Sequence, residues 1–299
     1  MLARLLRLLL LFELFGYFLA SLWLIGLAAW RPFAALLLMC LLAAAWRTWM
    51  IAVTYGFASL HRSPPPAQFR IGTKRQLFES AREVAALTAL LGAEAFGNVF
   101  PKPDAPCQPG AGQLPLLLIH GYNCNRGFWW WLKPRLEAQG RSVASLTLEP
   151  MHGDIDAYAE QIAQRVNWLC RITGAARVVL VGHSMGGLVA RAYLRRYGEE
   201  RVARLITLGT PHQGSVLAQL GMGRNARQME QGNAWLRELA TAPLPIPCVA
   251  VFSWQDNYVM PQRNAMLAGA ENLALAGVGH LAMSISPAVL NTLLKLSAV

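Results

Sequence analysis

The chain has 299 residues, enough for one folded domain and an appendage, and 55% of them are hydrophobic. This fraction is high for a water-soluble enzyme and indicates a membrane-associated segment. The formal net charge is +11, but no dense basic stripe with interleaved aromatic residues is visible, which argues against a nucleic-acid partner. Attraction to anionic lipid headgroups is the more economical use of this charge.

Two long apolar runs open the chain. Residues 8–29 can cross ~30 Å of hydrocarbon as a helix, and a second run, 33–55, follows the break at Arg31-Pro32. A cleaved signal peptide would have a shorter apolar core and a polar mature start, whereas apolar sequence resumes here. We therefore expect a transmembrane helical hairpin within residues 1–60, the alternative being a buried helical pair packed on the catalytic domain. Interfacial positions would be held by tryptophans, at Trp23, Trp30, Trp46 and Trp49.

Basic residues flank this predicted hairpin unequally. Only Arg31 lies in the turn between the two runs. The other basic residues precede the first run, lie near the end of the second run or follow it: Arg4, Arg7, Arg47, Arg62, Arg70, Lys74 and Arg75. The positive-inside rule then places both chain ends, and the catalytic domain with them, in the cytoplasm. Arg47 leaves an alternative open, because it shortens the second run to 33–46. A single-pass anchor would put the catalytic domain outside the inner membrane, facing the periplasm.

Residues 61–113 are interpreted as linker and amphipathic helix. SPPPAQF, residues 63–69, is a stiff proline linker. Thr73 and Gln76 have capping-box spacing and predict a helix that runs to about Leu91 and ends at Gly92. A second linker, PKPDAPCQPGAGQ, leads to the catalytic domain, and the helix can pack on that domain or lie on the bilayer. Its expected apolar stripe comprises Leu77, Ala81, Val84, Leu87 and Leu91.

The predicted catalytic domain, 114–299, opens with LLLIHGYN, residues 116–123. Its first four residues predict a buried strand, and the rest form the loop after it. FWWW, 128–131, opens the next helix. Phe128 and Trp129 can line an acyl pocket, touch the membrane or be buried in the core.

A single serine lies between glycines in the stretch VGHSMGG, directly after an apolar segment. Residues 178–181 predict a buried parallel strand, and residues 185–197 predict a helix with one apolar and one arginine-rich side. Ser184 thus occupies a strained strand-to-helix turn that brings the helix close to the strand. Residues two before and two after must lack bulk, and Gly182 and Gly186 meet that need. This arrangement is the nucleophile elbow G-x-S-x-G.

Three more motifs follow apolar, strand-like segments (205–208, 248–253 and 273–278): TLGTPHQGS at 207–215, SWQDNYVMP at 253–261 and GVGH at 277–280. Together with LLLIHGYN and VGHSMGG, they resemble α/β-hydrolases in order and rough spacing, most of all bacterial lipases and esterases. The resemblance covers the chain from Leu114 to its C-terminus. It implies the α/β-hydrolase fold, a mostly parallel sheet flanked by helices, preceded here by the transmembrane hairpin. It also places that hairpin in a bacterial inner membrane.

In this fold the catalytic groups follow the order serine, acid, histidine. Two histidines follow Ser184, and His212 comes too early to leave room for an acid, so the general base is assigned to His280. Asp256 is the one aspartate after Ser184 and follows a predicted strand. It would accept the second imidazole N–H and stabilise the imidazolium. Glu271 is the alternative acid.

An oxyanion hole needs preorganised donors. The backbone N–H of Met185, directly after the nucleophile, is one expected donor, and the resemblance implies the backbone N–H of Tyr122 as the second. His120 and His183 are interpreted as packing and hydrogen-bonding residues rather than bases. A lid or cap is expected over 214–247, where Val216 and Leu217 can contact an acyl chain, although an ordinary amphipathic helix packed on the core explains the pattern as well.

The sequence thus predicts a membrane-anchored serine hydrolase that cleaves carboxylic esters with an apolar acyl group through an acyl-enzyme intermediate. Its expected partners are a lipid or small hydrophobic ester and membrane lipids. The five cysteines show no metal-ligand spacing, and neither a cofactor nor a metal is expected. Alternatives are a phospholipase or acyl-thioesterase with the same triad, and a non-catalytic membrane scaffold with a hydrolase fold.

Overall fold

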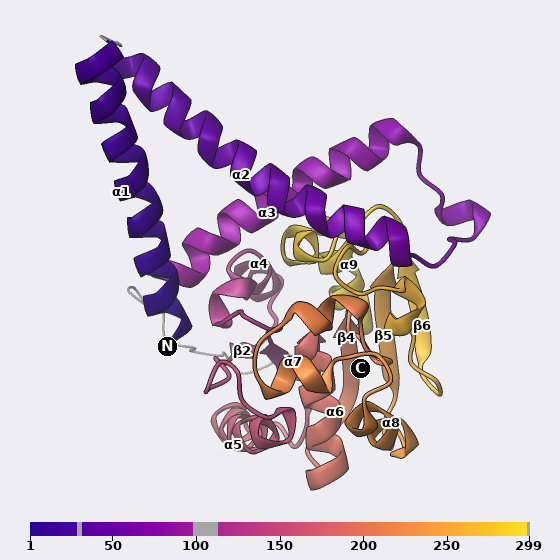
Figure 1. Cartoon of the computed structure of the whole chain (residues 1–299). Coiled ribbons are helices and arrows are strands. Elements are labelled where there is room, and N and C mark those ends of the chain that lie inside the picture. Colours follow the sequence, from indigo (N-terminus) through magenta and orange to yellow (C-terminus); the bar gives the residue numbers. More distant parts are fainter. Residues whose placement is uncertain (29–31, 98–112, 298–299) are drawn as a thin grey trace.

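A parallel sheet forms the centre of the molecule in the computed structural model, which describes residues 1–28, 32–97 and 113–297. The six strands of these residues are ordered β2-β1-β3-β4-β5-β6 (Figure 1). Every neighbouring pair is parallel. The strands are β1 (Leu116–Ile119), β2 (Val143–Ser145), β3 (Val178–His183), β4 (Val202–Leu208), β5 (Cys248–Ser253) and β6 (Glu271–Leu275).

Helices cover both faces of this sheet, because its central strands carry apolar side chains on both sides. Leu117 and Ile119 face one core, which is closed by α5 (Ile155–Thr173) and α6 (Met185–Tyr197). Leu116 and Leu118 face the other core. That second core is closed by α3 (Thr73–Phe96), α4 (Leu132–Ala138) and α9 (Pro287–Leu296).

Two N-terminal helices, α1 (Leu2–Ala28) and α2 (Pro32–His61), diverge from the sheet and come together at a tip far from it (Figure 1). Both are long and apolar enough to cross a membrane by length and composition, and only 6% and 11% of their most apolar stretches are buried. This exposure contradicts the alternative of a buried helical pair. Trp30 and Arg31 lie outside the described residues.

Arg47, which interrupts the second apolar run, is paired across the two helices. Its guanidinium donates to both carboxylate oxygens of Glu13, at 2.8 and 3.0 Å. Glu13 also accepts a hydrogen bond from Tyr17. A buried, paired arginine does not end the apolar helix, and α2 continues to His61.

The helix α3 differs from its prediction at both ends and in its buried face. Gly72 is its N-cap, with no side-chain capping bond, so the Thr73 capping box does not form. The helix passes Gly92 and ends at Phe96. The predicted stripe is half-buried or exposed, with Leu77 66% exposed. The face turned to the domain instead carries Glu79, Glu83, Ala86, Leu90, Glu94 and Ala95.

Short helices complete the chain, and several lie over the carboxyl ends of the strands. The predicted lid, 214–247, contains η3 (Val216–Leu220), α7 (Arg224–Gln228) and α8 (Ala234–Thr241). The remaining ones are η1 (Ala67–Phe69), η2 (Arg126–Trp129), η4 (Gln262–Ala265) and η5 (Leu281–Ile285). The strand predicted over 273–278 instead begins at Glu271 and ends at Leu275. Of the second predicted linker, residues 101–112 with Cys107 lie outside the described residues.

Candidate active site

Ser184 occupies the predicted strand-to-helix turn between β3 and α6. Its backbone has φ 53° and ψ −125°, a left-handed φ that a side chain adopts only under constraint. The Ser184 N–H donates to Leu208 O at 2.9 Å. A Cβ at Gly182 would meet Gly187 N at 2.5 Å, and one at Gly186 would collide with the carbonyls of Ile119 and His120. The glycines of the elbow are therefore required by the close approach of α6 to the sheet.

A buried acid–imidazole pair lies on the next loops of the same sheet edge. His280 Nδ1 is 2.8 Å from Asp256 Oδ2, and the two residues are 3% and 1% exposed. The other carboxylate oxygen, Oδ1, accepts the N–H groups of Tyr258 and Val259 at 2.8 Å each. Burial alone would lower the pKa of His280, but the Asp256 carboxylate and Glu83 raise it above its ordinary value. Glu271, the alternative acid, is exposed at the opposite end of β6.

Ser184 and His280 line one cavity of about 410 Å³. The loop after β1 closes it beside the serine, since a Cβ at Gly121 would lie 2.9 Å from Ser184 Cβ. Tyr122 borders this cavity, and Met185 is the first residue of α6. The two expected oxyanion donors thus directly follow Gly121 and Ser184, the two residues in this close contact.

Three buried histidines near this edge, other than His280, have structural contacts. His120 Nε2 accepts the Leu148 N–H at 2.9 Å. The ring of His183 stacks on Phe128 with centroids 4.2 Å apart, and His212 contacts Thr207 Oγ1 at 3.0 Å. Burial lowers the pKa of His183 and His212 well below the ordinary value, and that of His120 to about 4. The three rings therefore stay neutral at physiological pH, and each has at least one ring nitrogen in contact with a protein partner.

Of the four residues expected to contact an acyl chain, only Leu217 borders the cavity. Phe128 and Trp129 are fully buried in the sheet's core, so their placement as pocket residues is wrong. Val216 also lies outside the cavity lining, and its N–H donates to Met260 O. The turn at η3 directs only one of the two neighbouring side chains inward.

Much of the cavity wall comes from the N-terminal helices, which sequence reasoning did not assign to the site. Leu6 of α1 and Met50 of α2 contribute to it, and α3 adds Leu87, Leu90, Leu91 and Glu94. Leu220 of the lid region also lines the cavity, although its side chain is 66% exposed. No periodicity in one segment could reveal a wall that three helices build together.

A family model of the α/β hydrolase fold matches residues 115–244. The triacylglycerol lipases of Pseudarthrobacter phenanthrenivorans and Burkholderia plantarii are each 33% identical over 116 residues, 36% of this chain and 36% and 32% of those proteins. The chain thus spans about a third of the length of the curated relatives that it matches. The crystal structure of mature Bacillus licheniformis lipase BlEst2 matches with TM-score 0.59 and 19% identity, over 64% of this chain and 94% of that one.

The chain has the α/β-hydrolase fold. A second solved structure, the esterase of Exiguobacterium antarcticum, has a TM-score of 0.51 at 18% identity, over 64% of this chain and 93% of that one. The predicted fold and the resemblance to bacterial lipases and esterases are therefore confirmed. The N-terminal helices α1 to α3 lie outside the region that the family model matches.

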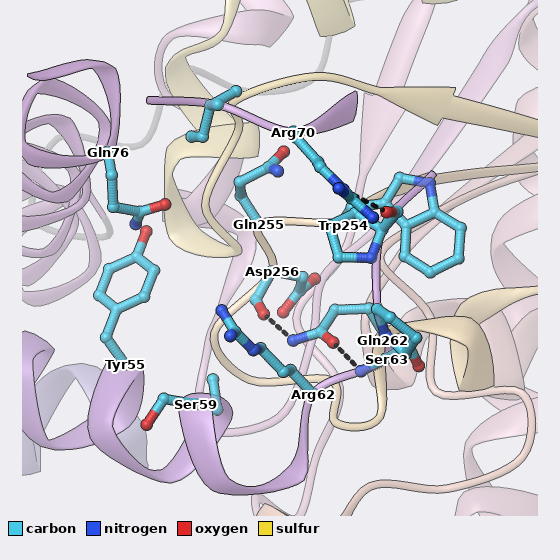
Figure 2. Close-up of a pocket in the computed structure, with 14 residues that line it drawn as sticks. Tyr55, Ser59, Arg62, Ser63, Arg70, Gln76, Trp254, Gln255, Asp256 and Gln262 are labelled. Carbon is cyan, nitrogen blue, oxygen red and sulfur yellow. Dashed lines mark hydrogen bonds between the residues drawn. The ribbon is translucent and has the colours of Figure 1, made fainter. Parts of the chain in front are cut away.

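A larger cavity, about 630 Å³, lies between the end of α2 with its linker and the loop after β5 that carries Asp256 (Figure 2). Here the linker after α2 is joined to that loop, since Gln262 Nε2 donates to Asp256 O at 2.9 Å and Gln262 Oε1 accepts the Ser63 N–H at 2.9 Å. Arg62 and Arg70 line this cavity. Asp256 itself borders this cavity, whereas Ser184 is not among its lining residues.

Around the cavity of Ser184, the described residues show neither an activated thiol nor a metal site. Cys124 borders the active-site cavity, and burial raises the pKa of its thiol well above the ordinary value, which disfavours the nucleophilic thiolate. Among residues 1–28, 32–97 and 113–297, no group of three His, Cys, Asp or Glu side chains is placed to hold a metal ion.

Proposed function

We propose that the chain is a membrane-anchored serine ester hydrolase that cleaves carboxylic esters with an apolar acyl group. The observation that carries the proposal is the shared cavity, in which a serine on a strained turn faces the same space as a buried imidazole–carboxylate pair. A serine hydroxyl becomes nucleophilic when an adjacent base accepts its proton. The similarity to triacylglycerol lipases supports an ester substrate.

In the proposed mechanism, Ser184 Oγ attacks the ester carbonyl while His280 Nε2 accepts the hydroxyl proton. Asp256 holds the other imidazole N–H and stabilises the imidazolium. The N–H groups of Tyr122 and Met185 stabilise the oxyanion. Collapse of the intermediate releases the alcohol, which takes the proton from His280 and leaves an acyl-serine. Water, deprotonated by His280, then cleaves this ester to release the carboxylic acid and restore the hydroxyl.

Cavity composition supports an apolar acyl group. Side chains of Leu6, Met50, Leu90 and Leu217 converge on the space beside Ser184. Burying each additional methylene of an acyl chain against such a wall contributes about 0.8 kcal/mol. Long acyl chains should therefore be preferred over acetyl.

Membrane anchoring is supported by the exposed apolar surface of α1 and α2. Large side chains there are mostly open to the surroundings, for example Phe12 at 78% and Phe33 at 77%. Because Leu6 and Met50 belong to these helices and also line the cavity, the substrate chain would reach Ser184 at the base of the hairpin. The charge asymmetry of the flanking residues favours a cytoplasmic hydrolase domain and a hairpin in the inner membrane.

The decisive experiment measures turnover of p-nitrophenyl esters of graded acyl length by detergent-purified protein, with Ser184→Ala as the matched control. Activity should rise with chain length and vanish in the variant, whose melting temperature should stay unchanged. Wild-type protein as inert as the variant on every ester would favour a non-catalytic scaffold. Equal turnover of acetyl and long-chain esters would contradict the assignment of the apolar wall.

A further inference from the structure

The loop that carries His280 is held from outside the sheet by a carboxylate of α3. Glu83 is fully buried. Its Oε1 accepts the N–H of Leu281 and its Oε2 accepts the N–H of Ala282, both at 2.8 Å. These are the two peptide groups that directly follow His280. Both carboxylate oxygens thus bind the backbone on the C-terminal side of the proposed base, with no solvent to compete.

The preceding side of the loop is shaped around the same carboxylate. A Cβ at position 279 would collide with Glu83 Oε2, so the close approach of α3 requires Gly279. The His280 N–H itself donates to Asn257 Oδ1 at 3.2 Å, and Asn257 Nδ2 donates to Thr54 Oγ1 of α2 at 2.7 Å. The N-terminal helices therefore reach the base by two independent routes.

Glu83 also acts on the imidazole through its charge. Burial raises the pKa of Glu83 to about 7, while the two N–H groups and His280 oppose that rise. In turn, the Glu83 carboxylate is one of the groups that raise the pKa of His280, after Asp256. The titratable side chains around this ring come from three segments: Asp256 and Tyr258 from the loop after β5, His183 from the end of β3 and Glu83 from α3.

We propose that Glu83 is a positioning residue of the hydrolase, which fixes the backbone after His280 so that the imidazole meets both Asp256 and Ser184. The inference rests on the proposed role of His280 as general base. It extends the catalytic machinery to α3, a helix that precedes the matched family region. Charge-assisted hydrogen bonds to a buried carboxylate are among the strong ones, so the geometry of the base depends on this helix.

The test compares Glu83→Gln with Glu79→Gln, which neutralises a second buried glutamate one turn earlier on α3. Glu79 is 1% exposed but pairs with Arg82 at 2.9 Å, and it lies against Gly277 rather than the peptides after His280. Glutamine at 83 offers one acceptor oxygen where the loop presents two donors. We expect kcat/KM to fall by about ten-fold or more, mostly in kcat, because one buried N–H loses its acceptor.

The pH profile separates positioning from simple loss of stability. Without the Glu83 charge, the pKa of His280 falls, so the acid limb of kcat/KM should move to lower pH in Glu83→Gln. Glu79→Gln should keep the wild-type limb. Wild-type kcat and an unmoved acid limb in Glu83→Gln would overturn the proposal.

Two further measurements keep the outcome interpretable. Labelling by a fluorophosphonate probe reports whether Ser184 is activated in wild-type protein. Absence of labelling there refutes the proposed function, whereas equal labelling rates in wild type and Glu83→Gln refute only the role of Glu83. If Glu83→Gln fails to fold, hydrogen exchange in wild type decides: strong protection of the Leu281 and Ala282 amides supports the proposal, and exchange at the rate of an open loop refutes it.

Discussion

Glu94, at the far end of α3, allows a quantitative test of how the helix is built into the domain. The side chain is 5% exposed, and its carboxylate oxygen accepts the Asn125 N–H at 3.4 Å. Burial raises the pKa of Glu94 from 4.5 to about 8, against hydrogen bonds from Cys124 and Asn125 that lower it. The folded protein thus holds a proton on this carboxyl at pH 7, which the unfolded chain releases.

The sign of the pH dependence follows from this difference in bound protons. Below about pH 4.5 both states are protonated, and the full contribution of the neutral carboxyl to stability is present. As the pH rises from about 4.5 to about 8, that contribution is lost, because the unfolded chain gains stability by releasing the proton that the folded protein keeps. At about 1.4 kcal/mol for each pKa unit, the loss between pH 4.5 and pH 8 is about 4 kcal/mol.

The substitution Glu94→Gln removes this pH dependence, since glutamine has nearly the same shape and no charge. Chemical unfolding in detergent, followed by tryptophan fluorescence at pH 5, 7 and 8.5, gives the free energy of unfolding of both proteins. The wild-type value should fall with pH by about 4 kcal/mol more than the value of the variant. Glu137→Gln is the matched control, because Glu137 is 38% exposed and pairs with Lys133 at the surface. Parallel curves for wild type and Glu94→Gln would refute the reasoning.

Four other predictions concern the active site. Gly186→Ala places a Cβ against the backbone carbonyls at the end of β1. The free energy of unfolding should therefore fall by about 3 kcal/mol, and ester assays should show no turnover. A fully active variant would contradict the geometry of the nucleophile elbow. In Asp256→Asn, kcat should fall by about 10⁴-fold, as expected when the imidazole loses its orienting carboxylate, and a loss below ten-fold would argue for another acid. Because the pKa of His280 is raised and its neutral form acts as the base, wild-type kcat/KM should increase with pH through a pKa above 6.5; an acid limb below 6 argues against this base. Met50→Trp should reduce turnover of long-chain esters and leave turnover of acetyl esters unchanged. The control is Leu8→Trp, because Leu8 is exposed and does not line the cavity. Equal losses on both esters in Met50→Trp would contradict a contact between Met50 and the acyl chain.

The strands and the nucleophile turn could be predicted from sequence because their signals are local. The bounds of β1, β5 and α6 agree with prediction to the residue, since continuous apolar strands and a glycine-bounded serine leave few alternatives. The α/β-hydrolase fold followed from the order of five motifs. The roles of Ser184, Asp256 and His280 stay predictions, although the structure brings the three residues to one sheet edge.

The failures concern features that depend on tertiary partners. A stripe of glutamates on α3 reads as a solvated face. Its burial depends on the peptide groups of the His280 loop for Glu83, on two arginines for Glu79 and on the Asn125 N–H for Glu94. Phe128 and Trp129 follow the oxyanion loop closely in sequence, yet η2 turns both into the core. β2 has only three residues, too few for a periodic signal. The cavity wall of Leu6 and Met50 needs contacts between segments far apart in the chain.

The Glu13–Arg47 pair bears on how the proposed membrane hairpin would be made. A single helix entering hydrocarbon alone would carry one uncompensated charge, at a cost of about 2.5–3.5 kcal/mol near the bilayer centre. Joined side by side at 2.8 Å, the two charges cancel, so insertion of both helices as one unit is favoured over stepwise entry. Removal of either partner should therefore leave a fraction of newly made chains with only one helix integrated, a topology that glycosylation or cysteine accessibility mapping would detect.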